Sequence, residues 1–258
     1  MTHRAIAKWA SNFRNRSAME WQSEGLIIGT RRHGESSVII ETMTAEFGRH
    51  LGLVKSGRSR KYAALLQPGN SVQLVWRARL ADHLGMFTVE ALKLRAAGLM
   101  ESRQRLALSQ LLCEHLRLLP ERDPHPRLYA EALAMHDNDA DGETLARALA
   151  KFEMRLLNEL GFGIDVSACA VTGEEEGLCY VSPRTGRAVT KPAGEAYKDK
   201  LFALPDVLGG SLEMDKADAI DAAFRLTGHF LHLHIWSPRQ LSPPSMRQGL
   251  IEGLVKAL

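Results

Sequence analysis

The sequence predicts an α+β protein, in which a five-stranded β-barrel is followed by an α-helical C-terminal domain. Short β-rich runs separated by glycine-containing turns fill residues 25–92. From about residue 99 onward, apolar residues recur with the spacing of helix faces. The charge also changes sign, since residues 20–98 carry eleven basic and seven acidic side chains and residues 99–258 carry eighteen and twenty-three. These observations indicate two domains with different partners.

The five strands are expected at residues 25–30, 37–42, 50–54, 71–79 and 84–92, with a short helix at residues 61–66. A barrel with a helix between its third and fourth strands has the layout of an OB-fold, although an SH3-like barrel has a similar pattern. In the fourth strand, alternation places Trp76 inside the barrel and Arg77 and Arg79 on its outer face.

The composition of the 258 residues excludes several classes of protein. With 45% hydrophobic and 24% charged residues, the chain is too apolar to be disordered and can fill a core in each domain. No apolar run approaches the ~18–20 residues that span a bilayer. Three cysteines do not make a paired disulfide framework. We therefore expect a cytoplasmic protein.

Residues 1–19 precede the first strand pattern and carry four basic and no acidic side chains. This composition resembles a transit peptide, but the segment lacks the apolar stretch of a secretory signal. Met19 directly precedes the β-rich region. We interpret the segment as a flexible leader or the product of an alternative start codon.

Basic side chains are concentrated in one part of the predicted barrel. Residues 47–81 contain seven basic residues and no acidic ones, and the loop 55–62 has four cations among serine and glycine. Guanidinium groups bind phosphate oxygens in a bidentate manner, and a Ser/Gly loop lets backbone N–H groups approach phosphate as well. The alternative interpretation is a solvated charged face. Tyr62 either stacks on a base or, as we favour, belongs to the core. The predicted DNA-binding residues are Arg31, Arg49, Lys55, Arg58, Arg60, Lys61, Arg77 and Arg79.

Helices are expected at residues 102–119, 126–135, 145–160, 215–236 and 243–258, with a β-poor segment from 162 to 190. The sequence contains no phosphate-binding glycine motif, H-E-x-x-H or G-x-S-x-G. His229 and His232 share one side of their helix, whereas His234 lies well round it, so the three do not form a metal site. We therefore predict neither an enzyme nor a cofactor.

A zinc site prefers four thiolates in two C-x-x-C pairs. Here Cys169 is followed by Thr172, and Cys179 by Ser182, at the positions of the second cysteines. Because hydroxyl groups are poor zinc ligands, we expect no metal in this segment.

Several segments together resemble the RecO family of bacterial recombination mediators, over a span from about residue 19 to the C-terminus. They include EWQSEGLII at 20–28, LVKSGRSRK at 53–61 and VWRAR at 75–79. The most specific is KFEMRLLNELGFGID at 151–165, followed by CAVTG at 169–173 and YVSPRTGRA at 180–188.

The resemblance implies an N-terminal OB-fold at residues 20–98 and a helical domain at 99–258, with a four-cysteine zinc site in many members. Thr172 and Ser182 depart from that site, so residues 162–190 are expected to be a degenerate zinc-finger-like insertion. The family also implies a non-catalytic role in DNA repair, recombination and the response to DNA damage, at the bacterial nucleoid. Members bind single- and double-stranded DNA, anneal complementary strands and, with RecR, help to load RecA onto DNA coated by single-strand-binding protein.

The acidic helical domain is expected to hold protein partners. The C-terminal tail of single-strand-binding protein is acidic, so it needs a basic and apolar lining, for which the candidates are Arg117, Arg122 and Arg155. An RNA-binding OB-fold protein is the main alternative, because the same groove chemistry accepts either sugar. A metal hydrolase that uses the terminal histidines is the third. The sequence leaves open the oligomeric state and the residues that contact RecR.

Overall fold

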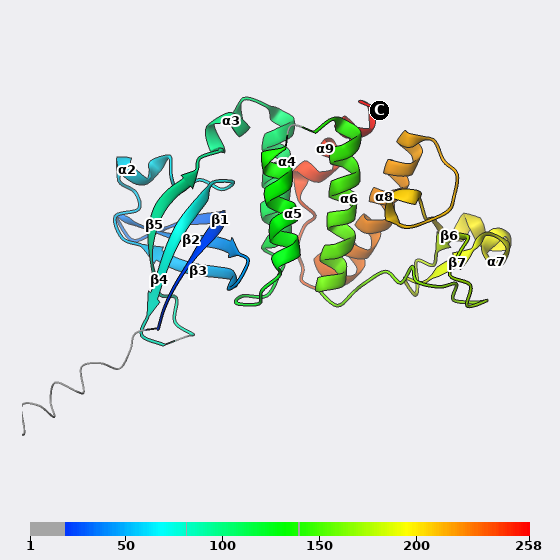
Figure 1. Cartoon of the computed structure of the whole chain (residues 1–258), viewed down its shortest axis with the longest axis horizontal. Helices are drawn as coiled ribbons and strands as arrows, with labels where there is room; N and C mark the ends of the chain where they lie inside the picture. The colour runs from blue at the N-terminus through cyan, green and yellow to red at the C-terminus, as the bar shows by residue number, and fades with distance from the viewer. Residues whose placement is uncertain (1–18, 81, 139) are drawn as a thin grey trace, which may run out of the picture.

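The computed structural model describes residues 19–80, 82–138 and 140–258. A β-barrel lies at one end of the molecule, a layer of helices stands beside it, and a small sheet lies at the far end (Figure 1). Within these ranges, no helix is long and apolar enough to cross a membrane.

The barrel is closed in the strand order β1-β2-β3-β5-β4. Its strands are β1 (Met19–His33), β2 (Ser37–Thr44), β3 (Gly48–Val54), β4 (Ser71–Ala78) and β5 (Met86–Lys93), and α2 (Arg60–Ala63) lies between β3 and β4. Neighbouring strands are antiparallel except β3 and β5, which pair in parallel where Leu53 faces Met86. This order and the position of α2 confirm the predicted OB-fold.

The first strand begins six residues earlier than the predicted start at residue 25. Residues 19–26 pair with β4, from Met19 opposite Ala78 to Leu26 opposite Ser71. The sequence pattern missed this extension because it contains Glu20, Gln22 and Glu24, which are disfavoured or neutral in strands. Pairing with an existing strand outweighs those weak preferences.

Apolar side chains from all five strands fill the barrel. Trp76 is 2% exposed, as the alternation predicts, and packs with Leu74, Phe87 and Val89. The half-buried Trp21 stacks between two rings, with centroids 4.3 Å from Phe47 and 5.7 Å from Trp76.

The helical domain contains α3 (Ala96–Met100), α4 (Arg103–Leu116), α5 (Pro126–Asp137), α6 (Gly142–Glu159), α8 (Lys216–Leu231) and α9 (Ser245–Val255). Ser102, Asp141 and Asp215 cap α4, α6 and α8, since each side chain accepts a hydrogen bond from a backbone N–H in the first turn. Short turns are α7 (Lys191–Gly194), η1 (Glu195–Lys200) and η2 (Asp206–Leu208). The predicted helix 215–236 changes after Leu231 into a π-helical turn, His232–Trp236.

The expectation of a β-poor segment at 162–190 was wrong. Strands β6 (Leu178–Val181), β7 (Ala188–Thr190) and β8 (Phe202–Ala203) form a sheet in the order β7-β6-β8. Each strand is only two to four residues long, so alternation of apolar and polar residues has no room to show in the sequence.

The barrel and the helical domain share an apolar core. Leu26, Ile28 and Met43 from the outer surface of β1 and β2 join the same buried cluster as Leu112 and Cys113 of α4. Burial raises the pKa of the Cys113 thiol to about 12, which fits its role as a small packing residue. The two domains therefore meet through buried apolar contacts rather than as separate bodies.

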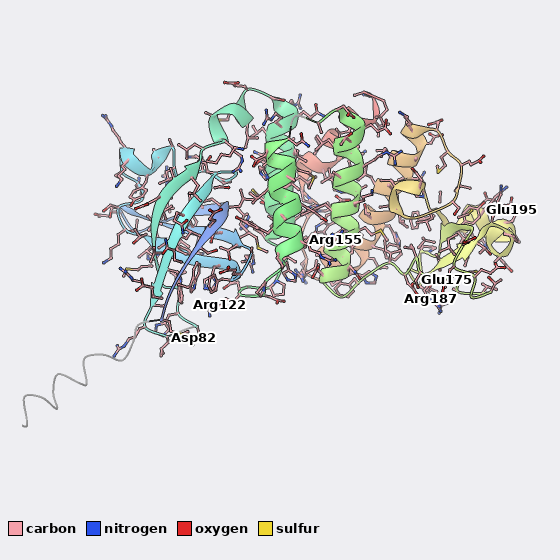
Figure 2. The ribbon with its side chains drawn as sticks, viewed as in Figure 1. Asp82, Arg122, Arg155, Glu175, Arg187 and Glu195 are labelled. Atoms are coloured by element: carbon pink, nitrogen blue, oxygen red, sulfur yellow. The ribbon has the colours of Figure 1, made fainter. Side chains whose placement is uncertain are left out.

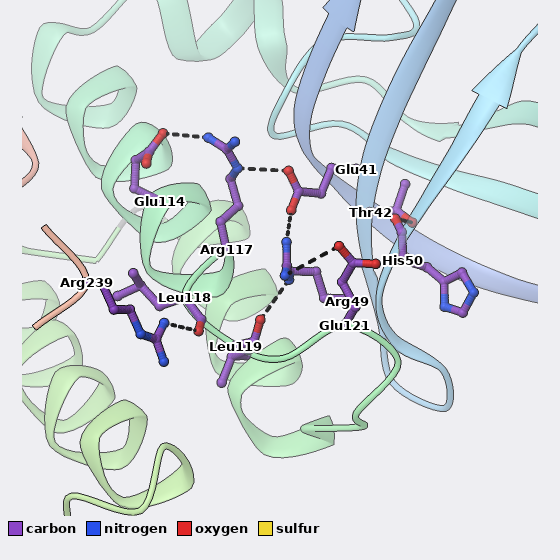
Figure 3. A network of polar contacts seen from close by, with 10 residues as sticks. All are labelled: Glu41, Thr42, Arg49, His50, Glu114, Arg117, Leu118, Leu119, Glu121 and Arg239. Carbon is purple, nitrogen blue, oxygen red and sulfur yellow. Dashed lines mark hydrogen bonds and ion pairs between the residues drawn. The ribbon is translucent and has the colours of Figure 1, made fainter. Parts of the chain in front are cut away.

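Ion pairs surround this junction (Figure 3). The half-buried Arg49 of β3 binds the Glu41 carboxylate and donates through Nε to the Leu119 carbonyl at 2.7 Å. Arg117, which follows α4, donates to the other Glu41 oxygen at 2.9 Å. Gly48 adopts φ +63°, and a Cβ there would lie 2.0 Å from the carbonyl oxygen of Asp123. The start of β3 is therefore fixed against the segment between α4 and α5.

A buried carboxylate joins four helices of the domain. Glu153 of α6 accepts two hydrogen bonds of 2.7 Å from Arg247 of α9, one of 3.0 Å from Nε2 of His115 and one of 2.6 Å from the Thr227 hydroxyl. Burial raises the pKa of Glu153, but pairing with Arg247 and His115 outweighs burial and lowers it below its ordinary value. Gly228 makes room for the guanidinium, since a Cβ there would lie 2.9 Å from Arg247.

Two buried histidines predict acid sensitivity. Burial lowers the pKa of His50 in the barrel and of His136 at the end of α5. The unfolded chain then takes up protons near the ordinary pKa of about 6.5 that the folded state does not accept. We expect the free energy of unfolding to be unaffected by these groups above about pH 7 and to fall as the pH drops through 6.5, by at most about 1.4 kcal/mol per pH unit per histidine.

Denaturant unfolding at a series of pH values checks this expectation. The variant His136→Gln should show a shallower pH dependence than the wild type, whereas His33→Gln, at the exposed end of β1, should keep the wild-type slope. An identical slope in wild type and His136→Gln would contradict the assignment.

Candidate nucleic-acid interface

Six exposed cations gather where the β1–β2 hairpin meets the segment that runs from the end of β3 into α2. We call this group the cationic end, and it consists of Arg31, Arg32, Lys55, Arg58, Arg60 and Lys61. In the sheet, Val38 of β2 lies between Arg32 of β1 and Val54 of β3. Strand pairing thus brings the hairpin beside the loop that begins at Lys55.

Arg58 ties the two segments of the cationic end together. Its backbone N–H donates to the Ser36 carbonyl at 3.0 Å, and its guanidinium donates to the Glu35 carbonyl. Within the part of the chain that the structure describes, none of the six cations forms an ion pair with a carboxylate. The charges of the cationic end are therefore free to attract an external polyanion.

The other predicted DNA-binding residues lie elsewhere. Arg77 makes a two-hydrogen-bond pair with Glu20 across β4 and β1, at 2.8 and 3.0 Å. Arg79 follows β4 and is exposed. Arg49 is held at the domain junction by Glu41, Glu121 and the Leu119 carbonyl. The structure thus brings together Arg31, Lys55, Arg58, Arg60 and Lys61, and not the remaining three.

Sequence reasoning missed Arg32. Strand alternation would have put Arg31 and Arg32 on opposite faces of β1, but both are exposed beside the hairpin turn. The signal that could have identified Arg32 is its position next to a Gly-containing turn, where both faces of a strand reach solvent.

Tyr62 packs against the barrel core and is half-buried, which agrees with the core interpretation. The ammonium of Lys61 lies 5.6 Å from the centroid of its ring.

The three candidate partner-binding arginines also lie in different parts of the molecule. Arg117 is paired with Glu41 and Glu114, and Arg122 donates to the His83 carbonyl of the β4–β5 loop at 3.0 Å. Both lie at the junction with the barrel. Arg155 lies farther along the molecule, on α6, as Figure 2 shows, and donates to Glu131 of α5 at 2.7 Å.

Arg155 borders a hollow that we call the α5–α6 groove, with a volume of about 270 Å³. Its floor is apolar, with Ala134, Met135, Leu145 and Ala148, and Lys151 stands beside Arg155. A second hollow of about 270 Å³ shares Lys151 and Arg155 and is lined further by Met154, Asn158, Ile164, Val207 and Leu208. Two cations thus stand between two partly apolar hollows.

The zinc site that the family resemblance implies does not fit the residues of this chain. The hydroxyl of Thr172, which stands where the second cysteine would be, donates a hydrogen bond to the Glu174 carboxylate at 2.9 Å. The Cys169 sulfur accepts hydrogen bonds from the N–H groups of Thr172 and Thr190, at 3.5 and 3.3 Å. Burial raises the pKa of the Cys169 thiol, but hydrogen bonds from the Thr172 side chain and from the backbone of Thr190, Thr172 and Val171 outweigh burial and lower the pKa to about 6.

Apolar packing holds this segment against the rest of the domain. Leu178, Tyr180, Val181 and Ala188 are buried and belong to the main core of the helical domain. Among the described residues, no three histidine, cysteine or acidic side chains gather as a metal site would require. The histidine cluster agrees with this, since His234 stacks on Phe162, at a centroid distance of 4.9 Å, rather than joining His229 and His232.

We expect chelators to leave the protein folded. Removing a structural zinc would cost on the order of 10 kcal/mol, whereas hydrogen bonds and packing do not respond to EDTA. The melting temperature after prolonged EDTA treatment, at constant pH and ionic strength, should equal that of the untreated protein. A marked fall, reversed by added zinc, would show that the segment binds a structural zinc despite Thr172 and Ser182.

Comparison with known proteins decides the family. The family model described as recombination protein O N terminal matches residues 19–95, and the one described as recombination protein O C terminal matches residues 100–242. The chain belongs to the recombination protein O family. The two RecO segments cover the barrel and most of the helical domain, and α9 lies beyond the second of them.

Curated relatives named DNA repair protein RecO match nearly the whole chain. The protein from Chelativorans sp. is 52% identical over 243 residues, which cover 93% of this chain and 97% of the relative. That from Sinorhizobium medicae is 49% identical over 240 residues, covering 93% and 96%. That from Agrobacterium fabrum is 49% identical over 241 residues, covering 93% and 95%. Membership of the RecO family supports a role as a recombination mediator in DNA repair.

Proposed function

We propose that this RecO-family protein binds single- and double-stranded DNA through the cationic end of its barrel and anneals complementary strands. With RecR, it would help to load RecA onto DNA coated by single-strand-binding protein, at the bacterial nucleoid. The observation that carries the proposal is the group of six exposed cations without carboxylate partners among the described residues. No catalytic group takes part.

The proposed binding is electrostatic and independent of sequence. Lysine and arginine replace condensed counterions on the phosphate backbone, and the released ions give binding a strong salt dependence. Two strands held on one protein lose much of their mutual repulsion and are brought close enough to pair. The acidic helical domain repels phosphate within a Debye length, about 8 Å at physiological salt, and so favours binding at the barrel.

Fluorescence anisotropy with labelled single-stranded DNA tests this function. Log Kd should rise linearly with log salt concentration, with a slope of about 0.7 per phosphate contact for single strands. Binding that is absent at low salt, or that does not change with salt, would contradict the proposal.

The acidic tail of single-strand-binding protein would dock in the α5–α6 groove. Its carboxylates would meet Lys151 and Arg155, and its apolar side chains would cover Met135, Leu145 and Ala148. The pairing of Arg155 with Glu131 reduces its contribution to this docking, because a tail carboxylate must compete with Glu131 for the guanidinium. Lys151 is the stronger candidate in this respect. Arg117 and Arg122 already have partners at the domain junction.

Replacing Lys151 and Arg155 together with alanine should weaken binding of a tail peptide by about tenfold or more, since a charge-assisted hydrogen bond contributes about 1.5–3 kcal/mol. Isothermal titration with the peptide measures the change. The matched control replaces Arg184 and Arg225, two exposed arginines elsewhere in the domain. Equal losses in the two variants would show only a general charge effect and would remove the tail from this groove.

A further inference from the structure

We propose that the cationic end holds a nucleic-acid strand by its phosphates alone and leaves the bases facing away from the protein, free to pair. This inference rests on the proposed DNA-binding function and specifies how the strand is held. Proteins that sequester single strands stack successive bases on aromatic side chains, in addition to binding the backbone. The described part of this barrel has the cations without the stacking rings.

No tryptophan, tyrosine or phenylalanine of the barrel is exposed among residues 19–80 and 82–95. The exposed phenylalanine and tyrosine residues of the described chain are Phe162 and Tyr197, at 38% and 62%, and both belong to the helical domain. Trp76 and Phe87 lie inside the barrel and are at most 4% exposed. A base held at the cationic end therefore meets no indole, phenol or phenyl ring that projects from the described barrel surface, and the ring beside it is the smaller imidazole of the exposed His33, which follows Arg32.

The half-buried rings of the barrel are already engaged. Trp21 lies between Phe47 and Trp76, and the rings of His50 and Phe87 approach it edge-on at 5.0 and 5.8 Å. Phe47 follows the exposed Glu46 in the β2–β3 turn, so a strand stacking there would meet a carboxylate. These rings stabilise the barrel instead of offering a platform for bases.

Tyr62 is the aromatic residue of the cationic end, and both its packing and its neighbour oppose stacking. Its ring packs against the barrel core that includes Leu65 and Leu66, while the ammonium of Lys61 lies 5.6 Å from the ring centroid. A base could replace that cation only by displacing a group that itself attracts phosphate.

Apart from Arg58, the cations of the cationic end also lack the fixed geometry that base-edge recognition requires. Reading a base takes a side chain held in one orientation toward donor and acceptor groups. Arg31, Arg60 and Lys61 are exposed, and no carboxylate in the described chain orients them. Mobile cations can follow a phosphate backbone, but they do not specify bases.

Phosphate-only binding explains how one surface could promote annealing. A strand whose bases are stacked on protein must release them before it can pair, whereas a strand held by phosphates presents its bases to a second strand. The same logic predicts similar binding of RNA and DNA, because the contacts involve neither bases nor the 2′-hydroxyl.

Binding of an abasic oligomer tests the inference. The probes are a labelled oligothymidylate, an abasic deoxyribose-phosphate oligomer of equal length and oligouridylate, measured by anisotropy at one salt concentration. Because Trp9 and Phe13 lie outside the described residues, the full-length variant W9A/F13A is measured beside the wild type. Permanganate reactivity of the bound thymines gives a second reading, since stacking protects the reactive double bond.

We expect all three oligomers to bind the W9A/F13A variant within about twofold, with thymines as reactive as in the free strand. One stacked base would make the abasic oligomer bind about 5- to 150-fold more weakly. A loss of that size, or protection of the thymines, in the W9A/F13A variant would overturn the inference while leaving DNA binding intact. Failure of every oligomer to bind would instead refute the proposed function itself.

Discussion

Replacing Arg247 with methionine is expected to destabilise the protein by about 3–5 kcal/mol, the cost of leaving a buried charge without its partner. Glu153 is fully buried, and Arg247 supplies two of its four hydrogen bonds. The substitution removes the cation while the carboxylate keeps only His115 and Thr227. Because Arg247 belongs to α9, we also expect the C-terminal helix to become accessible to proteases. Denaturant unfolding and limited proteolysis measure the two effects.

A second substitution separates charge from packing. In the Arg247→Met background, Glu153→Gln removes the buried charge and should recover part of the lost stability. Arg225→Met, on the exposed side of α8, is the matched control and should change the free energy of unfolding by no more than about 0.5 kcal/mol. A double variant less stable than Arg247→Met alone would contradict the account of the Glu153 cluster.

The largest expected effect on DNA binding comes from replacing Arg58, Arg60 and Lys61 together with alanine. Each residue that contacts a phosphate contributes about 0.9 to the slope of log Kd against log salt for duplex DNA, so the triple variant should lower the slope by about 2.7. Affinity should fall by a similar factor for all sequences. Anisotropy over a salt series with duplexes of contrasting base composition measures both quantities.

The matched control removes the same charge from the helical domain. Arg103, Arg184 and Arg225 are exposed, and replacing them with alanine should leave the slope close to that of the wild type. If this control lowered the salt slope as much as the Arg58/Arg60/Lys61 variant does, net charge rather than the cationic end would govern binding. A loss confined to one base composition would instead indicate contacts with bases.

Strand and helix positions could be predicted because the necessary signals are local. The alternation around Trp76 placed its side chain inside the barrel, and the apolar spacing within residues 145–160 indicated the helix α6. Turn residues and strand periods act over a few positions, and a sequence displays them directly. The short strands β6 to β8 could not be predicted, because two to four residues do not establish a period.

The candidate site was predicted in part, because the sequence shows where charges are but not what they meet. In the sequence, Arg49 and Arg58 are both arginines of a segment that contains no acidic residue, so nothing local distinguishes them. Folding brings Glu41 and Glu121 to Arg49, whereas the Arg58 guanidinium donates to the Glu35 backbone carbonyl. The contact between Glu153 and Arg247 spans 94 positions, and no local pattern indicates such a pair. The α5–α6 groove likewise depends on how two helices pack.

The rate at which complementary labelled strands anneal tests the central claim most directly, and energy transfer between the labels measures that rate. At low salt, the wild type and the Arg103/Arg184/Arg225 control should both accelerate annealing, and the Arg58/Arg60/Lys61 variant should do so much less. Raising the salt concentration should bring all three toward the uncatalysed rate. Full acceleration by the Arg58/Arg60/Lys61 variant would contradict the claim that the cationic end holds the strands.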